Sequence, residues 1–412
     1  MDDLLAHSEQ SFADSLEISE AWQPQAIAPT KFKVAGLFAG IGGIEEGFRR
    51  AGHKTILLAE QDEMANKVLE YHFPDITKHA DVRTLTQTSD ANLLTGGFPC
   101  QDLSQVGRCA GIEGPNSSLV GHVFDLLEKR GSEISWLVLE NVPFMLRLDR
   151  GEAISALADK LESLGWAWAY RIVDARVFGL PQRRRRVILV ASRDGDPRNA
   201  LLGQDASRPE QKKRGQHACG FYWTEGNRGI GWAIDAIPPL KGGSGVSIPS
   251  PPAIWFPRRG LIATPTIEDA ERLQGFDAGW TAPANDPGRG GRRRWRLIGN
   301  AVSTRMSEWI ARRLSKNIGT YDDTSDKAWN GKMKWPDAAW GYEGERGMSA
   351  VSDWPVERPQ EQLASCLKDD PVPLSLRATS GFWGRLRNST LRYEEAFGLD
   401  LAAHIENQKK RN

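Results

Sequence analysis

The chain has 412 residues, with 53 basic and 53 acidic side chains, so its formal net charge at pH 7 is zero. This length exceeds what one hydrophobic core usually serves, and we expect at least two lobes. No stretch approaches the roughly 18 apolar residues of a membrane-spanning helix, which excludes an integral membrane protein. The balanced charge also predicts no overall basic surface.

The amino terminus and the cysteines narrow the class further. Residues 1–30 contain six carboxylates and no Lys or Arg, so we expect no secretion signal and interpret residues 1–31 as an acidic flexible head. The four cysteines include no CxxC pair, which indicates neither a zinc site nor a disulfide framework. We therefore expect no metal and a reducing, cytoplasmic location.

The first elements alternate between strand and helix. Residues 33–38 have the pattern of a buried strand that runs into a glycine-rich turn at 39–43, and residues 44–51 have helical spacing. A second strand is expected at 55–60 and a second helix at 62–72. This alternation predicts an α/β fold: a Rossmann-like, doubly wound, mostly parallel sheet covered by helices.

The same alternation continues to residue 191. We expect helices at 117–130 and 151–164, and strands at 136–140 and 186–191. A catalytic and cofactor-binding domain is therefore predicted for residues 32–191.

The character of the sequence changes after residue 191. Gly, Pro, Arg and isolated aromatic residues without periodicity predict a small, loop-rich lobe at 192–262. Helices expected at 266–274, with Thr266 as N-cap, and at 301–314 predict that residues 263–316 return to the first domain. Residues 317–412 contain five tryptophans and no chemical motif, and we interpret them as an extension of unknown role.

The glycine turn indicates a nucleoside-containing cofactor. A dinucleotide fingerprint would need a third glycine where Glu45 stands, so a nicotinamide cofactor is disfavoured. The turn allows close backbone approach to a ligand, and Glu60, 18 residues after Gly42 and at a strand end, is placed to bind ribose hydroxyls. A plain structural turn would produce the same pattern.

Two further residues stand where reactive groups are expected. A lone cysteine is usually a small core residue, but Cys100 follows Gly96, Gly97 and Pro99 on a predicted loop, where it is better placed to react. Glu140 ends a predicted strand, at the edge of the sheet where such folds bind ligands, although an edge carboxylate can also be merely solvated.

A run of arginines opens the strand predicted at 186–191. Alternate residues of a strand share one face, so Gln182, Arg184 and Arg186 could point together into one site. An arginine cluster taken alone is more often a solvated face, and this alternative applies equally to Arg258 and Arg259.

Six short signatures, in one order, resemble those of the cytosine-5-specific DNA methyltransferase family, as in its bacterial Dcm-like members. They are the Phe38 glycine turn, Pro99-Cys100-Gln101, Glu140-Asn141-Val142, Gln182-x-Arg184-x-Arg186, Arg272-Leu273-Gln274-Gly275-Phe276 and Gly299-Asn300-Ala301-Val302. The resemblance covers about residues 33–314. It implies methyl transfer from S-adenosylmethionine to C5 of a flipped-out cytosine in double-stranded DNA, through a covalent Cys–C6 adduct.

The resemblance also implies roles at the reacting base. Cys100 is the thiolate that adds to C6, and Glu140 holds or donates a proton at N3. Arg186 contacts the base carbonyl, and Arg184 contacts the cysteine loop or a phosphate. No side chain identifies itself as the base for the C5 proton, so water or hydroxide remains an alternative.

The cofactor and DNA contacts implied by the resemblance form two sets. The cofactor set is Phe38, Gly40, Gly42, Glu60, Asp81, Val82, Pro99, Asn300 and Val302. The DNA set is Gln101, Ser104 and Gln182, with Arg228, Lys241, Arg258 and Arg259 in the insertion, which serves as a target-recognition lobe in the family.

Two positions depart from the family pattern. Many members have Asp two residues before the Phe of the glycine turn, where this chain has Gly36, so one cofactor contact is lost or is supplied by water or another group. Pro239-Leu240 stands in place of a Thr-Leu pair in the target-recognition lobe, which leaves the details of base recognition open.

The implied partners are double-stranded DNA and a cognate restriction endonuclease or another defence-system component, with a monomer acting on DNA in a bacterial cytosol or nucleoid. The tRNA-methylating branch of the fold shares the thiol and the cofactor, but an insertion of about 70 residues favours DNA. A catalytically silent nucleic-acid-binding protein is the other alternative, and the intact Cys100, Glu140 and Arg186 argue against it.

Overall fold

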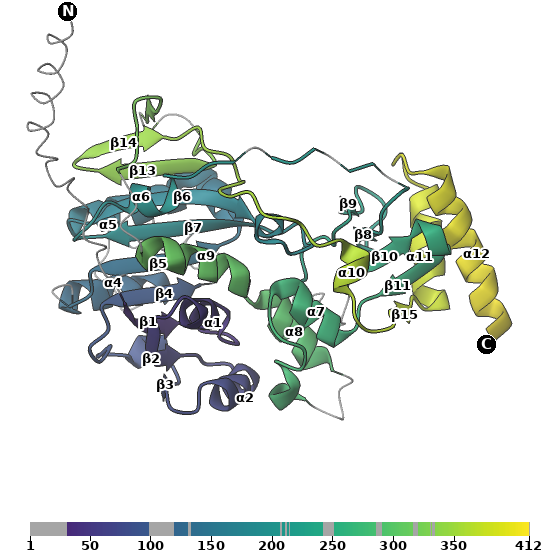
Figure 1. Ribbon diagram of the computed structural model, residues 1–412, viewed down its shortest axis with the longest axis horizontal. Coiled ribbons are helices and arrows are strands. Elements are labelled where there is room, and N and C mark those ends of the chain that lie inside the picture. Colours follow the sequence, from purple (N-terminus) through teal and green to yellow (C-terminus); the bar gives the residue numbers. More distant parts are fainter. Residues whose placement is uncertain are drawn as a thin grey trace, which may run out of the picture.

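Two β-sheets with helices packed on them make up the computed structural model of the chain (Figure 1). The structure describes residues 31–98, 119–130, 133–206, 208–210, 212–213, 215–241, 251–285, 291–315, 320–329, 331 and 334–411. One sheet has ten strands in the order β12-β14-β13-β6-β7-β5-β4-β1-β2-β3, and the other has five in the order β15-β11-β10-β8-β9.

Five strands form the parallel part of the large sheet, in the order β3-β2-β1-β4-β5. They are β1 Lys33–Leu37, β2 Lys54–Ala59, β3 Thr77–His79, β4 Leu93–Gly97 and β5 Trp136–Asn141. The order reverses between β1 and β4, and in open α/β sheets ligands bind at the carboxyl ends of the strands flanking such a reversal.

The remaining strands of the large sheet are antiparallel. They are β6 Ala167–Asp174, β7 Arg185–Ser192, β12 Lys327–Ala328, β13 Ala338–Tyr342 and β14 Glu345–Met348. The Rossmann-like α/β class is confirmed, but the sheet is mixed rather than mostly parallel. A parallel crossover needs a dozen or more residues, and only residues 175–184 join β6 to β7, so these strands pair antiparallel.

Helices lie on both sides of the large sheet. The helices of the domain are α1 Gly43–Arg50, α2 Glu63–His72, α4 Leu119–Arg130, α5 Glu152–Ser163, α6 Pro197–Leu201 and α9 Thr304–Ser315. Apolar residues of α4 and α5 belong to one buried cluster, and those of α1, α6 and α9 to a second. Within the described ranges, no helix is both long and apolar enough to cross a bilayer.

The small sheet is antiparallel and lies beyond α7 and α8 in Figure 1. Its strands are β8 Cys219–Phe221, β9 Ala233–Ile234, β10 Ala253–Phe256, β11 Leu261–Thr264 and β15 Val372–Pro373. The C-terminal helices α11 Leu376–Arg387 and α12 Glu395–Arg411 bury Phe382 and Phe397 against Phe221 and Trp255. The segment after residue 319 therefore adds strands to both sheets.

Three helices and five 3-10 turns complete the part of the fold that the structure describes. They are α7 Ile267–Gln274, α8 Arg292–Asn300, α10 Leu363–Cys366, η1 Val82–Thr84, η3 Pro143–Gly151, η4 Ala175–Phe178, η5 Pro257–Arg259 and η6 Ala282–Ala284. The expected N-cap of α7 is confirmed, because the Thr266 hydroxyl accepts a hydrogen bond from the Asp269 N–H at 3.0 Å.

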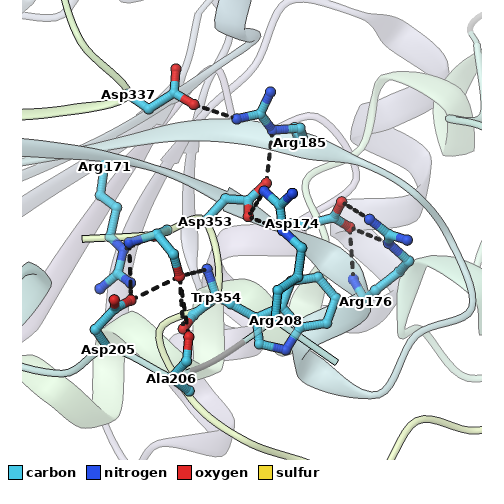
Figure 2. Close-up of polar contacts among 11 residues, drawn as sticks. Arg171, Asp174, Arg176, Arg185, Asp205, Ala206, Arg208, Asp337, Asp353 and Trp354 are labelled. Carbon is cyan, nitrogen blue, oxygen red and sulfur yellow. Dashed lines mark hydrogen bonds and ion pairs between the residues drawn. The ribbon is translucent and has the colours of Figure 1, made fainter. Parts of the chain in front are cut away.

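Ion pairs tie the C-terminal segment to β7 (Figure 2). Arg185 lies 2.6 Å from Asp337 and 3.0 Å from Asp353, and Asp353 also pairs with Arg208 at 2.5 Å. The buried Arg171 pairs with Asp205 on the same segment of chain that leads to Arg208. The outer strands are thus held by charge as well as by backbone pairing.

Candidate functional site

A cavity of about 440 Å³ opens at the carboxyl ends of β1, β2, β4 and β5, beside the start of β7 and the end of α8. Many residues expected at the site line it together: Phe38, Gly40, Glu60, Asp81, Val82, Glu140, Arg184, Arg186 and Asn300. Binding cavities for small molecules usually have about 300–1,000 Å³, so this one suits a cofactor and a base.

The glycine turn is held open by Glu60. One carboxylate oxygen of Glu60 accepts the Gly40 N–H at 2.7 Å, and the other accepts the Asp62 N–H at 2.7 Å. Phe38 and Gly40 have φ angles of 53° and 56°, the left-handed region that glycine adopts most readily. Glu60 therefore fixes the turn, and its remaining lone pairs face the cavity that it lines.

A second acidic side chain, Asp81, lines the same cavity as Glu60. Asp81 caps η1 and forms two-oxygen contacts with Arg83, whose hydrogen bonds hold the pKa of Asp81 below its usual range. Val82, which follows it, is buried and lines the same wall.

Glu140 of β5 and Arg186 of β7 form an ion pair in the cavity lining. The Arg186 Nε lies 2.8 Å from Glu140 Oε1, and both side chains are about nine-tenths buried. Within the described residues this buried oxygen accepts no hydrogen bond of good geometry, so the contact is an ion pair. Burial lowers the pKa of Arg186, and the carboxylate opposes that effect.

Asn141 connects this centre to the segment that leads to the cysteine. Its Nδ2 donates to the Phe98 carbonyl at 3.0 Å, and its Oδ1 accepts the Val142 N–H at 2.8 Å. Phe98 immediately precedes the segment in which Pro99, Cys100, Gln101 and Ser104 lie, all of them outside the described residues. The departure point of that segment is thus fixed beside Glu140.

Arg184 binds backbone rather than another side chain. Its Nη1 donates to the carbonyls of Leu240 and Gly299, and its Nη2 donates to Ala301 at 2.8 Å. It is 2% exposed, and burial together with the charge of Arg186 lowers its pKa to about 9, so it stays charged at neutral pH. Its buried Nε has no hydrogen-bond partner within the described residues.

Gln182 is also buried, and its side chain is hydrogen-bonded within the protein. Its amide donates to Leu273 O and to Gln274 Oε1, and its Oε1 accepts the Leu240 N–H at 3.1 Å. Gln274 in turn donates to Ile298 O at 2.9 Å. The late signatures are therefore locked to the arginine run by buried amides.

The DNA candidates of the insertion lie away from the cavity wall. Lys241 pairs with Glu225 at 2.9 Å and lies over the Tyr222 ring, and Arg228 is exposed. Arg258 and Arg259 are exposed on η5, the turn between β10 and β11. These four cations are not brought together with the cavity residues.

Two residues expected to bind the cofactor, Gly42 and Val302, lie behind the residues that line the cavity. Gly42 is the N-cap of α1, and a Cβ placed there would meet the Phe73 ring at 2.5 Å. Val302 stands behind Gly97, where an added Cβ would lie 3.3 Å from Val302 and 3.5 Å from Glu140. Both positions set the shape of the wall rather than its surface.

The sequence did not predict an ion pair in the cavity lining between α8 and the N-cap of α2. Arg296 on α8 pairs with Asp62, the N-cap of α2, and both residues line the cavity. The only signal for Arg296 is its place three residues before Gly299, because α8 itself was not expected from a stretch that begins with three arginines.

The sequence is similar to those of known proteins. The family model described as C-5 cytosine-specific DNA methylase matches residues 32–226. The chain is 44% identical over 375 residues to the Type II methyltransferase M2.BsuMI of Bacillus subtilis strain 168, which covers 89% of this chain and 96% of that protein. It is 33% identical over 181 residues, 42% of each chain, to the Type II methyltransferase M.MspI of Moraxella sp.

The fold has a counterpart among solved structures. The crystal structure of S. pombe Dnmt2 methyltransferase matches with a TM-score of 0.52 at 16% identity, and covers 69% of this chain and 98% of that one. At this identity the likeness concerns the fold alone.

Proposed function

This chain belongs to the C-5 cytosine-specific DNA methylase family, and from that premise we propose that it methylates a flipped-out cytosine in duplex DNA through a covalent adduct with Cys100. It is a DNA (cytosine-5-)-methyltransferase, and its family implies S-adenosylmethionine as methyl donor. The observation that carries the proposal is the Glu140–Arg186 pair, which lies in the same cavity as the glycine turn.

The nucleophile is assigned from the chemistry of the base. C5 of cytosine is a poor nucleophile, and addition of a thiolate at C6 makes it enamine-like. An ordinary thiol has a pKa of about 8.5 and is mostly protonated at neutral pH, so it needs nearby positive charge. Arg184, with its unpartnered Nε, and Arg186 supply that charge at the wall beside which the Cys100 segment leaves β4.

Glu140 and Arg186 orient the base and hold its proton. Glu140 donates a proton to N3 and holds it there, which offsets the negative charge that builds on the ring during thiolate addition. Arg186 donates to the base carbonyl. The C5 proton leaves to water or hydroxide, and elimination of the Cys100 thiolate restores the aromatic ring.

The residues around the glycine turn and at the end of β2 fit the methyl donor. S-adenosylmethionine supplies the methyl group, as an electrophile on a sulfonium. Glu60 at the end of β2 binds the ribose hydroxyls and Phe38 packs on the adenine, which Asp81 and Val82 also approach. Gly40, Pro99 and Asn300 bind the methionine end, and Gly42 and Val302 shape the wall behind it.

DNA enters between the two sheets in this proposal. A base inside a duplex cannot present C6 to a thiol, so the cytosine is flipped out at a cost of roughly a few kcal/mol, which backbone contacts repay. Residues 192–262 read the target, with Arg228, Lys241, Arg258 and Arg259 as contacts to DNA. Gln101 and Ser104 contact the strand near the cysteine, while the buried Gln182 orders the wall behind them.

The biological setting follows from the relatives. M2.BsuMI is named as a Type II methyltransferase, and we propose that this chain likewise protects DNA against a cognate restriction endonuclease, acting as a monomer. The 317–412 segment, which adds strands to both sheets, holds the two lobes of that monomer together.

The test is methyl transfer with tritiated S-adenosylmethionine to duplex DNA of mixed sequence and, separately, to total tRNA. We expect label at C5 of cytosine in DNA, abolished in Cys100→Ala and retained in the matched control Cys109→Ala. Label confined to tRNA would favour the tRNA-methylating alternative, and wild-type turnover in Cys100→Ala would exclude the covalent mechanism.

A further inference from the structure

A fully buried carboxyl group, Glu45, lies beneath the glycine turn and takes no part in the mechanism above. It is 0% exposed, its Oε2 has no side-chain hydrogen-bond partner in the described residues, and its Oε1 accepts the Thr95 hydroxyl at 3.3 Å. Buried carboxyl groups are normally paired, because an unpaired charge in the interior is strongly unfavourable. Glu45 therefore lacks the partner that its burial requires.

The sequence makes room for this carboxyl group. A Cβ on Gly36 would lie 2.8 Å from the Glu45 Cδ, and the three atoms nearest to it all belong to Glu45. A side chain at position 36 would thus occupy the same space as the Glu45 carboxyl group. Gly36 and Glu45 are therefore coupled, because the absence of a side chain at position 36 leaves the space that the Glu45 carboxyl group fills.

The neighbouring charges leave Glu45 without a cation. Glu46, the next residue, differs: burial raises its pKa, but hydrogen bonds from Arg49 and Arg50 outweigh that effect and lower it. The helix α9, which packs on α1, brings Glu308, already paired with Arg312. Burial raises the pKa of Glu45 to about 7, and Glu60 adds to that effect.

The position of Glu45 points to the ligand that would pair with it. Gly36 and Thr95 stand two residues before Phe38 and Gly97, which line the cavity, so the carboxyl group lies about 7 Å below its floor at a rise of about 3.3 Å per residue. Gly97 borders Glu140, beside which the methyl group must be delivered. The lining as a whole has a small excess of negative charge, to which an ionised Glu45 would add: it carries Glu60, Asp62, Asp81 and Glu140 against Arg184, Arg186 and Arg296.

We propose that Glu45 is a specificity residue that distinguishes the cationic methyl donor from its neutral product. The inference rests on the proposed function. The sulfonium of S-adenosylmethionine stabilises the Glu45 carboxylate across the floor of the cavity, whereas S-adenosylhomocysteine, which has lost that charge with the methyl group, does not. Product release is thereby favoured over donor release once transfer has occurred.

The linkage has a definite sign. In the free protein Glu45 is protonated at pH 6 and ionised at pH 8, because its pKa lies near 7. Binding of the donor favours the ionised form and so releases a proton near pH 7. Affinity for the donor therefore rises with pH through this range, and affinity for the product changes less.

Calorimetry with each ligand at pH 6 and pH 8, in two buffers of different ionisation enthalpy, tests the proposal without methyl transfer. In the wild type we expect the preference for S-adenosylmethionine over S-adenosylhomocysteine to rise about tenfold from pH 6 to pH 8, with proton release on donor binding. Glu45→Gln should lose both effects, and Glu46→Gln, the matched neighbour, should keep them.

A relocation variant separates charge from packing. Gly36→Asp combined with Glu45→Ala puts a carboxylate into the same space from β1, and we expect it to restore the pH-dependent preference that Glu45→Ala alone lacks. An unchanged preference in Glu45→Gln would overturn the inference and leave the proposed function standing. Failure of the wild type to bind either ligand would instead overturn the proposed function.

Discussion

Four consecutive arginines, Arg183 to Arg186, divide between two environments. Arg184 and Arg186 line the cavity, one bound to three carbonyl groups and the other paired with Glu140. Arg183 donates to the Gly231 carbonyl at 3.1 Å, and Arg185 lies between Asp337 and Asp353 of the C-terminal segment. Arg185 and Arg186 are the first residues of β7, where neighbouring side chains point to opposite sides, and Arg183 and Arg184 lie just before the strand.

The comparison shows that a charge run has no single role. The even-numbered arginines shape and charge the reaction site, whereas the odd-numbered ones attach β7 to the small lobe and to the C-terminal strands. Variants of Arg184 and Arg186 should change turnover, with an added loss of stability for Arg184, and variants of Arg183 and Arg185 should change stability alone. Five substitutions test this division, from the largest expected effect to the smallest.

Arg186→Ala should have the largest effect. Loss of the guanidinium removes the donor to the base and leaves Glu140 unpaired in the cavity, so we expect kcat to fall by about 10²–10⁴-fold. Single-turnover methylation measures this, and calorimetry of cofactor binding should show little change. Arg185→Ala is the matched control, and similar losses in both variants would contradict the division.

Glu140→Gln should follow. The amide keeps the size of the side chain but cannot hold the N3 proton in the same way, so we expect kcat to fall by about 10²-fold with DNA affinity retained. The measurement is methylation rate against DNA binding on the same duplex. A rate within threefold of the wild type would remove Glu140 from the mechanism.

Arg184→Met should act on both stability and turnover. The carbonyls of Leu240, Gly299 and Ala301 would lose a buried donor, at a cost of about 1–3 kcal/mol in the free energy of unfolding. Urea unfolding measures this loss. Arg186→Met leaves no comparable set of carbonyl groups without a donor, so it should be less destabilised. A greater loss of stability in Arg186→Met than in Arg184→Met would contradict the assignment of Arg184 as a structural donor.

Asp353→Asn should lower stability alone. Asp353 is 4% exposed and pairs with Arg185 and Arg208, both of which are substantially exposed, so we expect a loss of about 0.5–1.5 kcal/mol. Thermal unfolding gives the loss, and kcat at a temperature well below the transition should stay within twofold. A large fall in kcat without a change in stability would place the C-terminal segment in the mechanism.

Arg183→Gln should have the smallest effect. The Arg183 guanidinium donates to the Gly231 carbonyl, which a glutamine can still reach through water, so we expect less than about 1 kcal/mol of destabilisation. Unfolding curves of this variant and of Asp353→Asn, recorded together, give the order. A greater loss for Arg183→Gln would show that the contact of β7 with the small lobe matters more than its ion pairs.

Local sequence was sufficient where short signals coincide with short structures. The turn at 39–43, the carboxylate at the end of β5 and the capped helix α7 each follow from a few neighbouring residues. The strand β6 and the helix α8 were not expected. α8 begins with three arginines typical of a solvated loop, and its helical form depends on burial of Arg294 against Glu271, which is distant in sequence.

The sequence by itself determined β1, β2 and β5 of the parallel half of the large sheet, the order of the signatures and the shared direction of Arg184 and Arg186, because periodicity and alternation are local properties of the chain. Only the tertiary structure decided that Gln182 is buried, that the last strands close both sheets, and that Glu45 fills the space left by Gly36. These depend on contacts between segments far apart in the sequence, which no local pattern encodes.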